Sequence, residues 1–271
     1  MSSKGKLAEF VKNNILVLDG AMGTMLQGGY EVKEIHRAYL EAGANMILTN
    51  TFGDKSSDNI ALSVKTAREA AEEYGAFVGL DVAPTGQLLE PVGDLKFDEA
   101  YDIFKKEMLL GSKAGVDAIY IETITDLQEA KCAVLAAKEN CDLPVFCTMS
   151  FEKNLKTYFG VDIPTMASAL TDLGADFLGI NCSVGPAEMR EMAAQLLEYT
   201  HLPVVIKPNA GLPRFENGVA IYDVEPEEFA AEMEKVASLG VSGIGGCCGT
   251  TPEFIKLLAE IARKGKSPRP S

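Results

Sequence analysis

Three of the six cysteines in this chain of 271 residues are placed where they could act together. Cys182 lies in the segment GINCS, and Cys247 and Cys248 form an adjacent pair in the segment GGCCGTT. Three thiolates can hold a tetrahedral zinc ion and leave its fourth position open, which is the pattern of a catalytic zinc site. The alternative is that each is a small buried side chain, the usual role of a cytosolic cysteine. A Cys-Cys dipeptide is not a specific zinc-ligand spacing, so residue types alone leave both interpretations open.

The other residues that commonly bind metals or move protons offer less. Cys132, Cys141 and Cys147 lie in a helix-like stripe, at a turn and within an apolar run, and we expect them to be structural. The only histidines are His36 and His201, one in a helix pattern and one at a helix end, and we expect structural or surface roles for both. Chemistry that needs several imidazoles is therefore nearly excluded.

A shared site for distant cysteines requires a fold that brings them together. Short, nearly continuous apolar runs alternate with stretches of helical spacing, which is typical of parallel strands covered by helices on both faces. The expected strands are residues 15–18, 46–49, 77–80, 118–121, 145–149, 177–180, 204–206 and 241–244. Helix ends followed by a glycine suited to the left-handed position occur at Gly43, Gly115, Gly174 and Gly240. Eight such units in about 250 residues are typical of a (β/α)8 barrel, and a doubly wound sheet, with fewer strands for this length, is the competitor.

The sequence thus predicts an α/β protein, a single (β/α)8 TIM barrel over residues 1–263, with a polar tail over residues 264–271. Each expected strand is followed by a polar, glycine-rich or cysteine-containing segment, among them DGAMGT, ETITD, NCSVGP, KPNAG and GGCCGTT. The opposite ends are plain helix-to-strand turns. Active sites of this fold gather at the C-terminal ends of the strands, so we expect the chemistry at that rim.

The barrel would place the cysteines across one rim, because the strands before Cys182 and before the Cys-Cys pair are next-but-one neighbours. Adjacent side chains of a regular strand point to opposite faces, so a strand alone cannot direct both Cys247 and Cys248 to one ion. Gly245, Gly246 and Gly249 bracket the pair and permit a strained backbone that could turn both sulfurs inward.

Composition excludes several classes of partner. With 25 Lys and Arg against 39 Asp and Glu the formal net charge is −14, which disfavours nucleic acids and anionic membranes. No apolar stretch is long enough to span a bilayer. The first residues, MSSKGKLAEFVKNN, do not resemble a secretory signal. A cytoplasmic protein with free thiols is expected.

Several motifs together resemble one known family. GGCCGTTPEFI at residues 245–255 and GINCS at 179–183 are similar to the cysteine motifs of the homocysteine S-methyltransferase family. LDGAMGTML at residues 18–26, TNTFG at 49–53 and KPNAG at 207–211 fit the same family at matching places. The resemblance extends over nearly the whole chain and is strongest to the homocysteine-binding barrel of cobalamin-dependent methionine synthases.

The resemblance implies a set of site residues. It assigns zinc to Cys182, Cys247 and Cys248, with the homocysteine sulfur in the open position, and homocysteine-binding groups to the DGAMGT loop and the Glu122-Thr123 pair. Carboxylates that could hold the α-ammonium are Asp19 and Glu122, although a solvated or helix-capping acid is the alternative for each.

The substrate carboxylate could be bound by backbone N–H groups of the first loop, which are offered by Gly20, Ala21 and Gly23. Asn209 could bind substrate or fill the vacant zinc position, but a turn residue is about as consistent with its place before Ala210-Gly211.

The implied reaction is methyl transfer to the thiolate of homocysteine, giving methionine. A free thiol has a pKa of about 8.5 and is mostly protonated at neutral pH, whereas zinc coordination deprotonates it. We expect the methyl donor to be methylcobalamin or another methylcorrinoid, either on a separate protein or free. S-methylmethionine, S-adenosylmethionine or betaine as donor is the alternative, and so is a homocysteine-binding module without turnover of its own. Betaine is disfavoured because the chain has no tryptophan, although Tyr30 and Phe52 could substitute.

Overall fold

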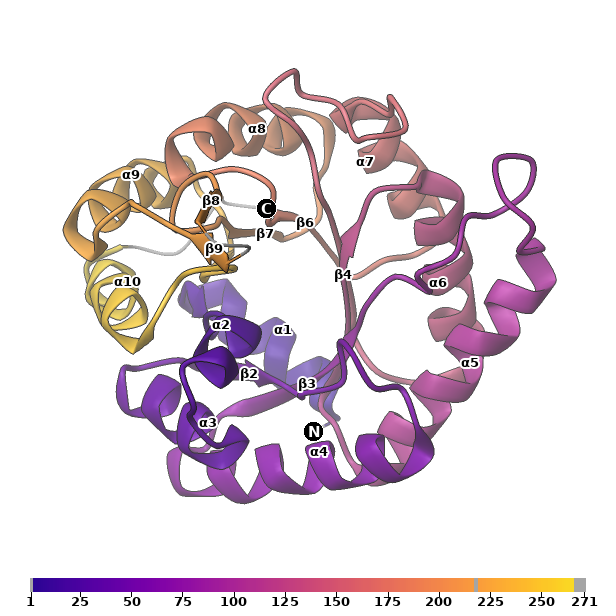
Figure 1. Cartoon of the computed structure of the whole chain (residues 1–271), viewed down its shortest axis with the longest axis horizontal. Helices are drawn as coiled ribbons and strands as arrows, with labels where there is room; N and C mark the ends of the chain where they lie inside the picture. Colours follow the sequence, from indigo (N-terminus) through magenta and orange to yellow (C-terminus); the bar gives the residue numbers. More distant parts are fainter. Residues whose placement is uncertain (1, 217–218, 266–271) are drawn as a thin grey trace.

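Eight short parallel strands form the centre of the molecule, each at one of the expected apolar runs (Figure 1). The computed structural model describes residues 2–216 and 219–265. The strands are β1 (Leu16–Val17), β2 (Met46–Leu48), β3 (Phe77–Val82), β4 (Ala118–Ile124), β5 (Val145–Met149), β6 (Phe177–Asn181), β7 (Val204–Lys207) and β10 (Gly243–Ile244). Their order is β1-β10-β7-β6-β5-β4-β3-β2. A parallel bridge between Leu18 and Met46 joins the two ends of this sheet, so the predicted (β/α)8 barrel is confirmed.

A ring of helices covers the outer face of the strands (Figure 1). The helices are α2 (Met22–Gln27), α3 (Val32–Glu41), α4 (Ser57–Ala71), the 3-10 turn η1 (Glu72–Tyr74), α5 (Phe97–Ala114), α6 (Leu127–Asn140), α7 (Ile163–Asp172), α8 (Pro186–Tyr199), α9 (Pro226–Ser238) and α10 (Pro252–Lys264). Local signals set several ends: the Asp126 side chain accepts a hydrogen bond from the Gln128 N–H at the start of α6. The four glycines expected after helices all have positive φ, at 107°, 99°, 84° and 91°.

The barrel has two hydrophobic layers. The outer layer lies between the strands and the helices, and the inner layer fills the barrel itself. Three stacked rings cross the interior, Tyr120, Phe146 and Phe177, with centroid separations of 5.1 and 3.9 Å. Helix α1 (Ser3–Asn13) adds Leu7 and Val11 to this layer and lies behind the barrel in Figure 1. It therefore closes the mouth formed by the N-terminal ends of the strands.

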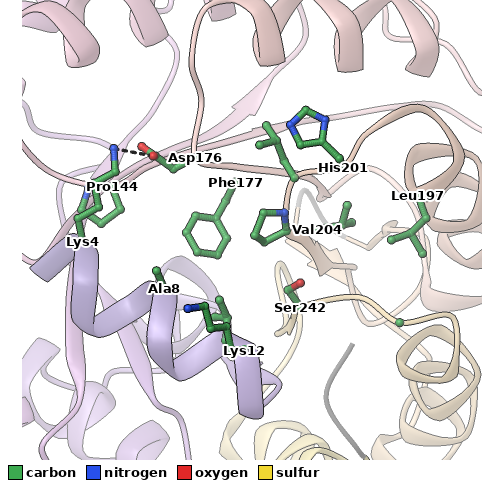
Figure 2. Close-up of a pocket in the computed structure, with 14 residues that line it drawn as sticks. Lys4, Ala8, Lys12, Pro144, Asp176, Phe177, Leu197, His201, Val204 and Ser242 are labelled. Atoms are coloured by element: carbon green, nitrogen blue, oxygen red, sulfur yellow. Dashed lines mark ion pairs between the residues drawn. The ribbon is translucent and has the colours of Figure 1, made fainter. Parts of the chain in front are cut away.

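A hollow of about 730 Å³ lies beside α1 at that closed mouth. Figure 2 shows α1 facing Phe177, Val204 and Ser242, with Lys4 paired to Asp176 at 2.8 Å. Apolar side chains and strand starts form much of its wall. It lies at the opposite end from the cysteine motifs, and we assign it to the packing of α1 and not to the chemistry.

Two features were not expected from the sequence. An antiparallel hairpin, β8 (Arg214–Glu216) and β9 (Val219–Ile221), interrupts the connection between β7 and α9. Strand β10 is only two residues long, shorter than the run expected over residues 241–244. Of the expected tail, Lys264 is the last residue of α10, and residues 266–271 lie outside the described residues. Within residues 2–216 and 219–265, no helix combines the length and apolarity that crossing a membrane requires.

Candidate active site

The three cysteines singled out in the sequence converge at the open mouth of the barrel. Cys182 follows β6, and Cys247 and Cys248 lie in the loop between β10 and α10. Their sulfur atoms all lie within 4.8 Å of one another, and the Sγ atoms of Cys182 and Cys248 are 4.0 Å apart. Ligands about 2.3 Å from a tetrahedral zinc ion are about 3.8 Å from each other. The three thiols therefore fit a soft metal ion with small adjustments of their side chains.

Backbone hydrogen bonds between loops hold this cluster in place. The Cys182 N–H donates to the Lys207 carbonyl at 3.0 Å, and the Cys247 N–H donates to the Pro208 carbonyl at 2.8 Å. The Cys248 carbonyl accepts from the Ala210 N–H at 2.9 Å. The segment after β7 thus ties the two cysteine loops together. Cys182 itself has φ of 61°, a left-handed conformation that is uncommon for a residue other than glycine and that is typical of functional sites.

Hydrogen bonds among the three thiols shift their pKa values in opposite directions. The pKa of Cys248 is lowered to about 3 because the thiols of Cys182 and Cys247 donate hydrogen bonds to its sulfur. The pKa of Cys247 is raised by its hydrogen bonds with Cys182 and Cys248 and by burial. These hydrogen bonds favour negative charge on Cys248, and a metal ion bound at the cluster would replace thiol protons.

A pocket of about 420 Å³ opens next to the sulfurs. Its lining includes all three cysteines and most of the other predicted substrate-binding residues, namely Asp19, Gly20, Ala21, Gly23, Glu122 and Thr123. Asn209 is not among the lining residues. It is nevertheless buried after β7, and its Oδ1 has no hydrogen-bond partner in the part of the chain that the structure describes. An orphaned amide oxygen is costly, which marks Asn209 as more than a simple turn residue.

Carboxyl groups gather on the floor of this pocket. Asp19 follows β1, and its Oδ2 accepts the Leu48 N–H at 2.8 Å. Burial raises the pKa of Asp19 to about 6, although Lys207 opposes the shift. Asp81, from β3, also lines the pocket, and its pKa is raised first by burial and then by Glu122. A pocket with acidic groups held in low dielectric is suited to a ligand that brings a positive charge.

Lys207 is the cation within this acidic group. Its Nζ lies 3.3 Å from Glu122 Oε2 and 3.6 Å from Asp19 Oδ1, and 5.2 Å from the centre of the Tyr120 ring. Burial lowers the pKa of Lys207, but Glu122 and Asp19 outweigh burial and raise it well above its usual value. Lys207 is therefore a buried, charged group that faces two of the predicted binding residues.

An irregularity in β4 aims Glu122 and Thr123 at the pocket. The register of β4 against β5 shifts between Ile121 and Ile124, and Thr123 has φ of 63°. The Asn181 side chain stabilises this conformation, since its Oδ1 accepts the Thr123 N–H at 2.9 Å and its Nδ2 donates to Thr123 Oγ1 at 2.8 Å. Bulges of this kind re-aim side chains next to active sites.

The loop after β1 contributes the residues expected to bind a substrate carboxylate. Gly20, Ala21 and Gly23 all line the pocket. The Ala21 N–H already donates to Thr250 Oγ1 at 3.2 Å, so Gly20 and Gly23 are the better candidates for N–H donors. A side chain at Gly20 would collide with Thr250 and with the Tyr39 ring, which explains why this position needs glycine.

The remaining predicted positions lie away from this pocket. Cys132 and Cys147 are buried and Cys141 is partly buried, in agreement with structural roles. His36 is buried within α3, while His201 is exposed and lines the hollow beside α1. Neither histidine contributes to the acidic pocket.

Three polar residues at the site were not selected from the sequence. They are Asp81, Lys207 and Tyr222, of which Tyr222 hydrogen bonds to Cys248. Asp81 and Lys207 lie inside or at the end of a strand, in the runs LDV and VIK. A charged residue in such a run is the signal that could have found these two, because central strands of a barrel are buried on both faces.

A parallel barrel with a thiol cluster and an acid-lined pocket at its C-terminal mouth has the architecture of a barrel enzyme whose thiols could hold a soft metal ion. Comparison with known proteins makes this class specific. Residues 16–262 match the family model described as homocysteine S-methyltransferase. The chain belongs to the homocysteine S-methyltransferase family, so the predicted family and enzyme class are confirmed.

Similar proteins include two methionine synthases. The chain is 33% identical to that of Mycobacterium leprae (strain TN) and 32% identical to that of Mycobacterium tuberculosis (strain ATCC 25618 / H37Rv). These alignments cover 95% and 97% of this chain but 25% and 26% of the relatives. The chain therefore spans about a quarter of the length of these relatives.

A solved structure confirms the fold independently. The metallated form of the homocysteine methyltransferase MmuM from Escherichia coli superposes with a TM-score of 0.78 at 22% identity, covering 93% of this chain and 98% of that chain. Its apo form gives a TM-score of 0.76 at 23% identity, covering 92% and 97% of the two chains. At this level of identity the likeness concerns the barrel fold.

Proposed function

We propose that this chain transfers a methyl group to the sulfur of homocysteine, giving methionine, at a zinc site formed by Cys182, Cys247 and Cys248. The observation that carries the proposal is the convergence of three sulfurs within 4.8 Å beside a pocket of about 420 Å³. When bound, zinc would supply a Lewis acid that keeps the substrate sulfur deprotonated and nucleophilic at neutral pH. Thiolate ligands favour zinc over cations that prefer oxygen ligands, such as magnesium and calcium.

The pocket residues would orient the amino acid relative to the cluster. Asp19 and Glu122 would hold the α-ammonium, and Glu122 is joined to the cluster side of the pocket through Thr123 and Asn181. Gly20 and Gly23 would offer N–H groups to the α-carboxylate. A substrate fixed at both ends presents its thiol to the sulfurs in one orientation, which reduces the entropy lost at the reacting step.

We propose a methylcorrinoid as the donor, carried by a separate protein or free. Phe52 is the one aromatic side chain among the described lining residues of the pocket, and Tyr30 is not part of that lining. A quaternary ammonium such as betaine is normally bound by several aromatic rings, so this pocket supports betaine poorly. The loops around the open mouth also carry exposed apolar side chains, among them Leu88, Tyr158 and Phe215, which a large donor could contact. S-methylmethionine and S-adenosylmethionine remain the alternative donors, and a cytoplasmic location stays a prediction.

The central experiment combines metal analysis with calorimetric titration of homocysteine. Wild type should contain about one zinc per chain and bind homocysteine. Cys248→Ser should lose zinc and, as a consequence, homocysteine. Cys141→Ser is the matched control, because this thiol lies outside the pocket, and it should retain both. Retention of zinc and of homocysteine affinity by Cys248→Ser would overturn the assignment.

Methionine formation with each donor in turn then tests the donor. Product from methylcobalamin supports the proposal, whereas product from S-methylmethionine alone contradicts it. Tight homocysteine binding without product from any donor would favour a binding module that acts within a larger system.

A further inference from the structure

Lys207 brings a positive charge into the pocket that the proposed reaction does not use. Its side chain is 3% exposed and lies at the end of β7, among the lining residues of the pocket. A buried ammonium is costly unless it is paired with opposite charge. Here its two partners, Asp19 and Glu122, are the same carboxyl groups that are proposed to receive the substrate ammonium.

The two carboxyl groups come from distant parts of the chain, and Lys207 lies between them. Asp19 follows β1, whereas Glu122 belongs to β4. The backbone fixes one oxygen of Asp19 through the Leu48 N–H at 2.8 Å. The other oxygen, Oδ1, has no hydrogen-bond partner within 3.5 Å among the described residues and lies 3.6 Å from Lys207 Nζ. Lys207 therefore links the two carboxyl groups without saturating them, and oxygen capacity remains for a second cation.

We propose that Lys207 is a positioning residue for the substrate α-ammonium: it holds Asp19 and Glu122 as a fixed pair of carboxylates that accept one further positive charge. The inference rests on the proposed function, in which homocysteine occupies this pocket. Two carboxylates and one lysine carry one net negative charge, which a single α-ammonium neutralises. Lys207 would in this way favour thiols that carry an ammonium group over thiols that lack one.

Asp81 is consistent with this charge balance. It lies beside the pair and lines the same pocket. Burial and the neighbouring Glu122 raise its pKa, which favours its uncharged form. Lys207 is thus opposed mainly by the two carboxyl groups that it contacts directly.

The test compares two ligands on zinc-loaded protein by calorimetry: homocysteine, and 4-mercaptobutyrate, which has the thiol and the carboxylate but no ammonium. Lys207→Met should raise the Kd for homocysteine roughly ten- to a hundredfold, because Asp19 and Glu122 lose the charge-assisted contacts that hold them as a pair for the ammonium. The Kd for 4-mercaptobutyrate should change by less than about twofold, and the zinc content should stay constant. Lys138→Met is the matched control, because Lys138 is paired with Asp176 at 3.0 Å near the opposite mouth, and both Kd values should stay as in wild type.

Two further variants keep the proposal testable if Lys207→Met does not fold. Lys207→Arg retains the charge and should recover much of the preference for homocysteine, whereas Lys207→Gln, which can still hydrogen bond, should not. Equal losses for both ligands, or homocysteine affinity in Lys207→Gln equal to that of wild type, would overturn the proposal. Failure of the proposed function would look different, because wild type itself would then lack zinc or fail to bind homocysteine.

Discussion

Asn181 connects the two halves of the site, and replacing it should weaken both the fold and the metal site. Its side chain is fully buried at the end of β6. Oδ1 accepts hydrogen bonds from the Thr123 N–H at 2.9 Å and from Thr148 Oγ1 at 2.7 Å. Nδ2 donates to Thr123 Oγ1 at 2.8 Å and to Cys247 Sγ at 3.8 Å. One amide thus supports the left-handed conformation of Thr123 and contacts a proposed zinc ligand.

The expected cost of Asn181→Ala follows from these contacts. The partly buried Thr123 N–H would lose its acceptor, which costs about 1–3 kcal/mol. The left-handed backbone of Thr123 would also lose its support, which adds strain on the order of 1 kcal/mol. The Thr148 hydroxyl keeps an acceptor, since the Ile121 carbonyl lies 3.4 Å away. The free energy of unfolding should therefore fall by about 2–4 kcal/mol.

The loss of the N–H contact to Cys247 should appear separately in zinc affinity. Groups that orient a metal ligand from behind typically contribute ten- to a hundredfold to affinity, so Asn181→Ala should bind zinc about that much more weakly. Urea unfolding measures the first effect, and competition with a chromophoric chelator measures the second. Thr148→Val is the matched control, because it removes one partner of the same amide but leaves Thr123 and Cys247 in place. It should cost about 1 kcal/mol and leave zinc affinity unchanged.

The reasoning is refuted if Asn181→Ala and Thr148→Val bind zinc equally well. In that case the amide supports only the fold.

Two further predictions concern residues around and outside the pocket. Burial lowers the pKa of His36 to about 4 from 6.5. Between these pH values the unfolded chain therefore binds more protons than the folded chain. The free energy of unfolding should fall by about 3 kcal/mol as the pH drops through this window. His36→Leu should remove this component in urea titrations at a series of pH values, and an identical pH dependence in both proteins would contradict the assignment. Gly249→Ala should reduce the zinc content measured by metal analysis, because Gly249 has φ of 82° and a Cβ there would collide with the Tyr222 ring. Full zinc occupancy in this variant would show that the loop can adapt.

The barrel could be predicted because its strands carry a strong local signal. Continuous apolar runs are what strands buried on both faces require, and all eight strands lie within or around the expected runs. The hairpin of β8 and β9 was missed because it lacks such a signal. Its strands, RFE and VAI, have three residues each and are too short for a periodic pattern. The role of α1 as a cover for one mouth depends on tertiary packing of Leu7 and Val11, which local sequence does not encode.

Site residues could be predicted where they directly follow an apolar run that forms a strand. Cys182 and Glu122 stand where apolar runs end, so their position alone suggested the rim. Lys207 and Asp81 also directly follow expected apolar runs, but their position alone does not show what they contact. Their pairing depends on the register between distant strands, which places Lys207 beside Asp19 and Glu122. A lysine at a strand end is read from sequence as solvated, and only the barrel shows that it is buried.

The adjacent cysteines show how local strain and distant packing act together. A regular strand cannot direct both Cys247 and Cys248 to one ion, but neither cysteine lies in a strand. Strand β10 ends at Ile244, before both of them. The chain then turns at Gly249 with φ of 82°, and the Tyr222 ring occupies the space that a Cβ would need. The Tyr222 side chain hydrogen bonds to Cys248 and, after the two other thiols, helps to lower the pKa of Cys248. Tyr222 follows β9, so the hairpin segment that the sequence did not predict also supplies a partner to the thiol cluster, and substitutions in it should be judged by their effect on zinc as well as on stability.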